Sequence, residues 1–226
     1  MKNSIFAVAT VAAVLFIPLQ AAAQSDLTCN SSYAGGTYHN VTVPAGSVCI
    51  LVTTRVLGDV TVQKGASLEV DGGLGASSTI KGNVTANGCD HVYLFAMGPS
   101  GGVVVGGNLM ITNCANTSYA LGSPTDITQI VLIAGDTTCN NNPGGCFFAY
   151  AHFSHNFTCS GNSGGCVMGL DSIGATATLT NNEGIGIYLA DSFIGGNLNC
   201  GGNAGINPDL GSNAVAGTTS GQCSIF

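Results

Sequence analysis

The sequence predicts an all-β fold, a single parallel β-helix in which short strands wind in successive coils around an apolar axis. Three observations predict it: the composition, a repeated phrase and a two-residue alternation of apolar side chains. Of 226 residues, 7% are charged, 45% are hydrophobic and 34 are Gly. Disordered chains have the opposite balance, and four basic residues cannot supply the charged outer faces of a helical bundle. With these two classes excluded, the composition favours a Gly-rich β protein with many turns.

The repeated phrase consists of Gly, then Asn or Asp, then alternating apolar residues. Copies begin at Gly58, Gly82, Gly107 and Gly196, and a degenerate copy is His155–Cys159. The first three copies follow one another at nearly equal intervals, and the interval from Gly107 to His155 spans two such periods. A drifting period of about 20–25 residues is typical of a solenoid.

The residues between the copies indicate which solenoid this is. Apolar residues alternate with period two, as in Val41/Val43 and Val60/Val62, and clusters such as 140–145 separate these runs. Three short strands and three turns fill one coil of a parallel β-helix, and about eight coils fit the chain. A β-sandwich is the alternative fold, which explains the alternation but not the repeat.

The turns carry further expectations. We expect the Asn residues to tolerate left-handed backbone angles and to stack their amides between coils. We expect the neighbouring Gly residues to supply positive φ. Outward side chains are expected to be Thr, Asn and Ser, which would give the rod a polar, mildly acidic face.

The domain organisation is one leader and one domain. Residues 1–23 resemble a secretory signal peptide, with Lys2, an apolar run and a small-residue site at Ala21–Ala23. An uncleaved anchor is the alternative, although the run is shorter than a membrane span. Residues 24–226 form the β-helix domain, with an N-terminal cap at 24–40 and a C-terminal cap at 200–226 that cover exposed strand edges. We expect a secreted or periplasmic bacterial protein, with or without attachment to the cell surface.

All ten cysteines follow the leader, and in an exported chain an even number predicts disulfides. Zinc is the competing interpretation, but zinc sites favour short C-x₂₋₄-C pairs, which the sequence lacks. Ten cysteines allow many connectivities, of which we propose the pairs Cys29–Cys49, Cys89–Cys114, Cys139–Cys146, Cys159–Cys166 and Cys200–Cys223.

The Gly-Asn-Val/Leu repeats over residues 40–200 resemble secreted right-handed parallel β-helix proteins of pectin-lyase-like architecture. The tail, with Gly195–Cys200 and Gly221-Gln222-Cys223, is similar to the C-termini of many secreted bacterial proteins. This resemblance implies the architecture but no activity, because the architecture hosts lyases, hydrolases, esterases, adhesins and inert surface proteins alike.

We expect a non-catalytic structural or surface-binding role, with a glycan or surface protein as partner and no cofactor or metal. Nucleic acid is excluded as a partner because the chain, with net charge −7, has no basic footprint. The alternative is a carbohydrate-active enzyme, a polysaccharide lyase or glycoside hydrolase. Its best candidate residues are Asp90, His91, Asp126 and Asp136. The polygalacturonase-like motifs Asn-Thr-Asp, Asp-Asp, Gly-His-Gly and Arg-Ile-Lys are absent from the sequence.

Asp90 and His91 are the only adjacent acid–base pair among these candidates. We expect turn chemistry here, because neighbours on a strand point to opposite faces and do not easily hydrogen-bond. The recurring acidic residues Asp126, Asp136, Asp171 and Asp191 are expected to be solvated turn caps rather than a calcium row.

One row of threonines, Thr176, Thr178 and Thr180, has the alternation of an ice-binding face. A flat array needs many such rows, and the sequence predicts this one on a single coil.

Overall fold

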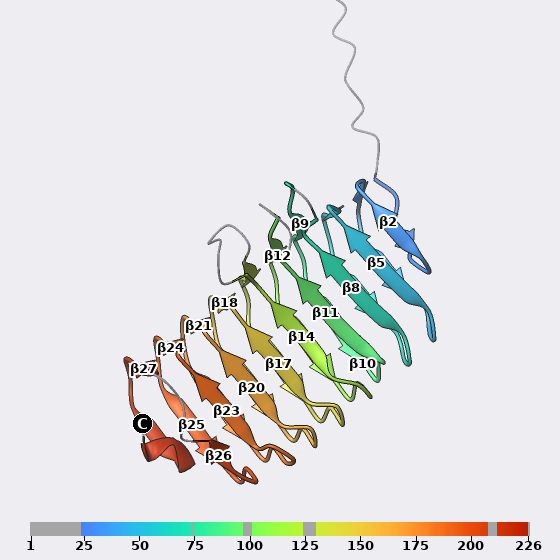
Figure 1. The fold of residues 1–226 in the computed structure, drawn as a ribbon. Helices are drawn as coiled ribbons and strands as arrows, with labels where there is room; N and C mark the ends of the chain where they lie inside the picture. Colours follow the sequence, from blue (N-terminus) through green and yellow to red (C-terminus); the bar gives the residue numbers. More distant parts are fainter. Residues whose placement is uncertain (1–23, 74, 97–100, 124–129, 208–211, 226) are drawn as a thin grey trace, which may run out of the picture.

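The protein is a parallel β-solenoid of about eight turns. The computed structural model describes residues 24–73, 75–96, 101–123, 130–207 and 212–225; the expected signal peptide and Asp126 lie outside them. Each coil contributes one strand to each of three sheets, which run along one axis (Figure 1). The fold class predicted by the sequence is therefore confirmed. No helix in these ranges has the length and apolar character needed to cross a membrane.

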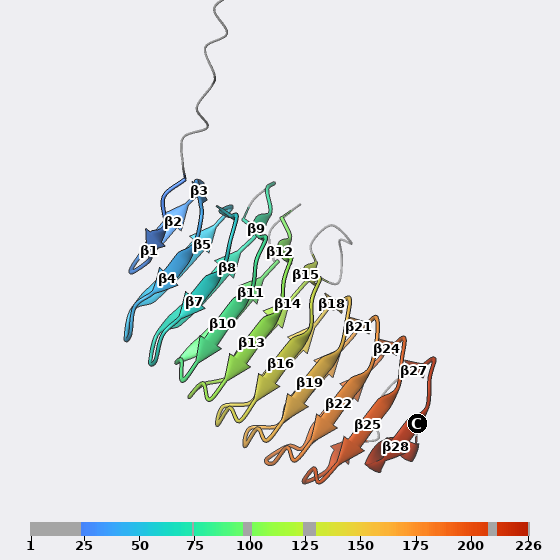
Figure 2. The ribbon, with the colours of Figure 1, turned by 180° about the vertical axis from the view of Figure 1, so that it is seen from behind.

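Sheet A contains ten parallel strands and is seen face-on in Figure 2. Its strands are β1 (Leu27–Thr28), β4 (Val41–Val43), β7 (Val60–Val62), β10 (Val84–Asn87), β13 (Leu109–Thr112), β16 (Thr137–Asn140), β19 (Phe157–Ser160), β22 (Ala177–Thr180), β25 (Leu198–Gly201) and β28 (Thr219–Gly221).

Sheet B contains nine parallel strands and faces the viewer in Figure 1. Its strands are β2 (Ser32–Ala34), β5 (Val48–Val52), β8 (Ser67–Asp71), β11 (His91–Phe95), β14 (Ser118–Leu121), β17 (Cys146–Ala149), β20 (Cys166–Gly169), β23 (Ile187–Ala190) and β26 (Ile206–Asn207).

Sheet C also contains nine parallel strands. They are β3 (Thr37–Tyr38), β6 (Arg55–Val56), β9 (Ser78–Ile80), β12 (Val103–Val105), β15 (Val131–Ile133), β18 (Ala151–Phe153), β21 (Ser172–Ile173), β24 (Phe193–Ile194) and β27 (Ala214–Val215). The short 3₁₀ helix η1 (Gln222–Ile225) follows β28 at the C-terminal end of the rod.

The coils are less uniform in length than the sequence predicts. In sheet A, Val41 pairs with Val60 across a short coil, whereas Leu109 pairs with Thr137 across a much longer one. The extra residues of the long coils fall between their sheet B and sheet C strands in the sequence. The double interval that begins at Gly107 does contain two coils, and its hidden boundary is Gly135-Asp136-Thr137, where a polar Thr137 stands at an inward position.

Alternate side chains of every strand point inward and form one continuous core, as the period-two pattern predicts. At mid-rod, Phe148 of sheet B, Phe153 of sheet C and Phe157 of sheet A meet on the axis, all fully buried. Their ring centroids are 4.9–5.4 Å apart. Each sheet thus supplies one ring to a cluster that joins all three.

Five disulfides join the cysteines in the predicted pairs. Their half-cystines are buried in the core, and Cys200–Cys223 fastens η1 to β25. Five disulfides fit an extracellular or otherwise oxidising environment.

The repeat glycines do not adopt positive φ, so that expectation is wrong. At the corner between sheets C and A the preceding coil passes too close for a side chain. A Cβ on Gly82 would overlap Asp59 Oδ1 and lie 2.5 Å from the carbonyl oxygen of Gly58. Glycine is required there by close approach of two backbones.

The expected stacking of Asn side-chain amides is confirmed at the end of the sheet A strands that leads to sheet B. Between sheets A and B, the buried Asn142, Asn162 and Asn182 form a ladder, each donating from Nδ2 to Oδ1 of the next Asn at 3.0 Å. At the corner between sheets C and A a different ladder forms, the corner ladder, in which the backbone N–H of Asn108 donates to Asn83 Oδ1 at 2.8 Å. Left-handed backbone occurs beside the first ladder, at Asn113, Asn141 and Asn181.

Candidate functional site

The outward face of sheet B carries a row of large apolar side chains that follows the rod axis. Because Val92 and Leu94 point into the core, Tyr93 points outward, and parallel in-register pairing repeats this direction on every coil. We call this row the aromatic column. Its members, in register, are Tyr93, Tyr119, Phe147, Val167 and Tyr188.

Rings on adjacent coils contact one another along the column. The centroids of Tyr93 and Tyr119 are 5.0 Å apart, and those of Tyr119 and Phe147 are 5.6 Å apart. The rings are half-buried, and Tyr188 is 36% exposed. The expectation of a uniformly polar outer surface is therefore wrong for this sheet. No local pattern in the sequence indicates the column, because each ring stands on a different coil.

A hollow of about 510 Å³ opens at the C-terminal end of the aromatic column. It is lined by Phe147, Val167, Gly169, Ile185, Tyr188 and Asn207. Gly169 creates part of this space, because a Cβ built there would have no neighbour within 4 Å. The hollow is mostly apolar, open to solvent and continuous with the column.

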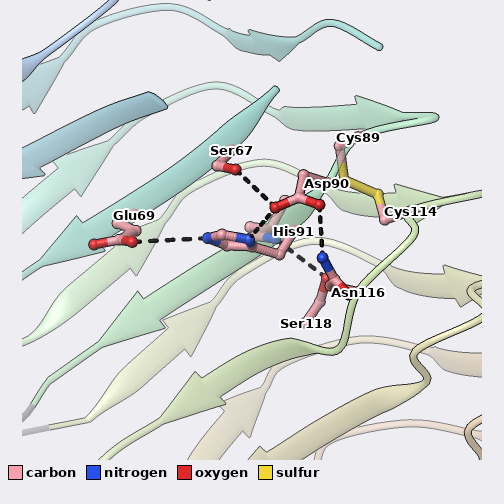
Figure 3. Close-up of polar contacts among 9 residues, drawn as sticks. Ser67, Glu69, Cys89, Asp90, His91, Cys114, Asn116 and Ser118 are labelled. Atoms are coloured by element: carbon pink, nitrogen blue, oxygen red, sulfur yellow. Dashed lines mark hydrogen bonds and ion pairs between the residues drawn. A yellow bond between two sulfur atoms is a disulfide. The ribbon is translucent and has the colours of Figure 1, made fainter. Parts of the chain in front are cut away.

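A polar cluster lies at the opposite end of the column, around Asp90 and His91 (Figure 3). His91 Nδ1 lies 2.9 Å from Asp90 Oδ2, in hydrogen-bond contact. Ser67 Oγ donates to the same carboxylate at 3.2 Å, and Asn116 Nδ2 donates at 2.7 Å. The expectation that Asp90 and His91 would not bond is wrong. Asp90 precedes β11 in the turn, where the alternation of a strand does not apply.

The imidazole of His91 is enclosed on its other sides. It stacks on Tyr93 with a centroid separation of 3.9 Å, and its Nε2 lies 3.7 Å from Glu69 Oε1. This Nε2 is buried and has no hydrogen-bond partner within the described part of the chain. His91 is therefore a fixed support for Tyr93 rather than an exposed base.

The electrostatics of the cluster follow from its hydrogen bonds. Burial raises the pKa of Asp90, but donors from His91, Asn116 and Ser67 together outweigh it and lower that pKa below its usual value. Burial, with the neighbouring Tyr119, Asp90 and Glu69, raises the pKa of Tyr93. Both groups keep one charge state at neutral pH, Asp90 ionised and Tyr93 neutral.

The structure does not bring the other candidate residues to this cluster. Asp136 lies before β16 at the corner between sheets C and A, where its Oδ1 accepts from the amide and the Nδ2 of Asn156, both at 3.1 Å. It is one rung of the corner ladder. Asp126 is outside the described residues, so Asp90 and His91 are the two candidates that the structure places together.

Two further acidic residues show contrasting environments. Asp191 is an exposed cap that accepts from the amide of Ser212 at 3.0 Å, as expected. Asp171 is only 3% exposed, so the expectation of a solvated cap is wrong there. It accepts from the amides of Ala151 at 2.8 Å and Gly169 at 3.1 Å. No three His, Cys, Asp or Glu side chains gather as metal ligands in the described ranges.

The burial of the Asp171 carboxyl group leads us to expect a specific pH dependence of the free energy of unfolding. Burial raises its pKa to about 8, from 3.8 for a free group, despite the two amide donors. The folded protein holds a proton that the unfolded chain releases, so this group's stabilisation is complete below pH 4 and is lost as pH rises toward 8. Asp171→Asn is expected to remove that loss. Urea titrations between pH 4 and pH 9 measure the free energy of unfolding of both proteins. We expect the variant to become more stable relative to the wild type as pH rises, and the same pH dependence in both proteins would contradict the assignment.

Sheet A has a different outward face. Its middle outward row is mostly threonine: Thr28, Thr42, Thr61, Thr85, Thr138, Thr158 and Thr178, with Met110 between Thr85 and Thr138. We call this row the threonine column. The expectation that the threonine row occupies one coil is wrong, since the row crosses the coils. Thr176 lies at the corner instead, where its amide donates to Asn156 Oδ1.

Comparison of the chain with protein-family models, with curated proteins and with solved structures gave no match in any of the three.

Proposed function

We propose that the protein is a secreted, non-catalytic bacterial β-helix protein of pectin-lyase-like architecture that binds an uncharged polysaccharide along sheet B. The observation that carries the proposal is the aromatic column together with the hollow at its end. A binding surface repeated over five coils suits an extended chain better than a compact ligand.

The chemistry of the column favours a sugar chain. Each pyranose ring has an apolar C–H face and a hydroxyl rim, and aromatic side chains bury such faces while leaving the rim in water. Tyr93, Tyr119 and Tyr188 also offer hydroxyl groups at the edge of the surface. Contacts between neighbouring rings restrict the side chains before binding, which lowers the entropic cost of binding.

The charge of the molecule favours a neutral glycan. The net charge is −7, and Glu69, Asp71 and Asp90 lie at one end of the column. An acidic surface repels polyanions such as uronate polymers. A neutral polysaccharide meets no such barrier.

The enzymatic alternative has less support. Both oxygens of Asp90 accept hydrogen bonds from protein donors, and Nε2 of His91 is covered. A general base must reach the proton that it removes. The pair therefore supports the aromatic column, and the exposed Asp136 lies apart from it at the corner between sheets C and A.

Binding to a panel of insoluble neutral polysaccharides tests the proposal. We expect Tyr119→Ala to weaken binding about tenfold or more, because it removes a central ring from the column. Gly169→Phe is expected to weaken it by filling the hollow. Phe193→Ala is the matched control, since this ring is 48% exposed on sheet C, and binding should not change.

Two results would overturn the proposal. Release of sugar from any polysaccharide would establish the enzymatic alternative. Absence of binding across the panel, or equal loss in Tyr119→Ala and Phe193→Ala, would show that sheet B is not a glycan surface.

A further inference from the structure

We propose that the outward face of sheet A binds ice. This face is separate from the aromatic column of sheet B, and the inference does not depend on the proposed glycan binding. It rests on three properties of the threonine column and its neighbouring row: two-dimensional order, unused hydroxyl groups and absence of charge.

The order of the face follows from its pairing. Thr138, Thr158 and Thr178 are direct partners on successive parallel strands, so their spacing along the rod is about 4.8 Å. A second outward row, two positions further along each strand, contains Thr112, Asn140, Ser160 and Thr180. Its separation from the first row is about 6.6 Å. The spacing along the rod lies close to the shorter unit-cell repeat of hexagonal ice.

The hydroxyl groups of the threonine column are available to water. In the described part of the chain, the side chains of Thr138, Thr158 and Thr178 make no hydrogen bond to protein, whereas Thr180 Oγ1 donates to Ser160 Oγ at 3.0 Å. Threonine is β-branched, so its methyl and hydroxyl take few orientations. The column thus presents ordered water sites separated by methyl groups.

The face carries no ionic side chain in either row. The threonine column continues with Asn199 and Ser220, and the second row spans Asn87 to Gly201. Charged groups hold water strongly in orientations of their own. Their absence from these two rows leaves the hydration of the rows to the regular array, and the carboxylates of Asp59 and Asp136 stand beside it at the corner between sheets C and A.

Strand propensity alone does not explain these threonines. Threonine is favoured in strands generally, so propensity would place it on all three faces. The middle row of sheet B is aromatic and aliphatic, and the middle row of sheet C includes Val104, Leu132 and His152. Threonine is concentrated on sheet A, which indicates a requirement specific to that face.

Ice recrystallisation and thermal hysteresis assays on the disulfide-bonded protein test the inference. We expect the wild type to keep ice grains small at micromolar concentration. Thr158→Tyr places a bulky ring at the centre of the array, and about tenfold more protein should then be needed. Met110→Thr repairs the gap in the column and should lower the concentration required.

Thr79→Tyr is the matched control, because Thr79 has the same outward position on sheet C. Its activity should equal that of the wild type, and thermal melting of each variant verifies folding. The inference is overturned when ice grains grow as fast with the wild type as in buffer alone. It is also overturned when Thr79→Tyr loses as much ice-binding activity as Thr158→Tyr. Tyr119→Ala should keep full ice activity, which separates this function from glycan binding.

Discussion

Phe153→Ala is expected to lower the free energy of unfolding by about 3–5 kcal/mol. Phe153 is fully buried, and its ring meets Phe148 and Phe157 at centroid distances of 5.4 and 4.9 Å. These three rings come from three different sheets. The corner ladders and strand pairing hold the sheets apart, so the coil cannot contract around the missing ring and a cavity remains.

Urea unfolding of the oxidised protein measures this loss. Phe193→Ala is the matched control, since Phe193 stands on the same sheet but is 48% exposed, and its change should stay within about 0.5 kcal/mol. Similar losses in the two variants would mean that the core rings do not join the three sheets.

Asn162→Leu is expected to cost about 3 kcal/mol or more, although leucine has the same branching and the same number of side-chain heavy atoms. Asn162 is fully buried; its Nδ2 donates to the carbonyl of Cys139 at 2.9 Å, and its Oδ1 accepts from the amide of Asn142 at 2.9 Å. Leucine leaves both backbone groups buried without a partner, at about 1–3 kcal/mol each. It also interrupts the amide ladder toward Asn182.

Two measurements isolate this effect. Urea unfolding gives the loss, and hydrogen exchange of the Asn142 amide should accelerate because that amide has lost its acceptor. Asn199→Leu is the control, since Asn199 lies on an outer face and its side chain accepts from the exposed Ser220 at 2.8 Å. An unchanged exchange rate at Asn142 would contradict the role assigned to the ladder.

The fold could be predicted from the sequence because its determinants are local. The alternation at Val60 and Val62 sets which side chains enter the core, and the spacing from Gly58 to Gly82 sets one coil. Cys89 and Cys114 stand one coil apart, whereas Cys139–Cys146 and Cys159–Cys166 each close a short loop within one coil. Gly135-Asp136-Thr137 escapes detection because a polar residue occupies its inward position.

The candidate surfaces could not be predicted in this way, because they depend on register between coils. Tyr93 pairs with Tyr119, and Tyr119 pairs with Phe147, across coils of unequal length. Unequal coils prevent a fixed period from aligning these rings. The threonine column escapes prediction for the same reason, while the contact of Asp90 with His91 depends on the shape of a turn.

From Thr137 onward the coils are almost equal in length, and the successive sheet A partners are Thr137, Phe157, Ala177, Leu198 and Thr219. The strands of these coils pair in the same pattern above and below, so in-frame duplication or deletion of one coil would preserve the strand pairing on either side. Rod length can therefore change during evolution in increments of about 4.8 Å. Where a ligand spans the whole length of one face, selection would therefore act on the number of coils, one coil at a time.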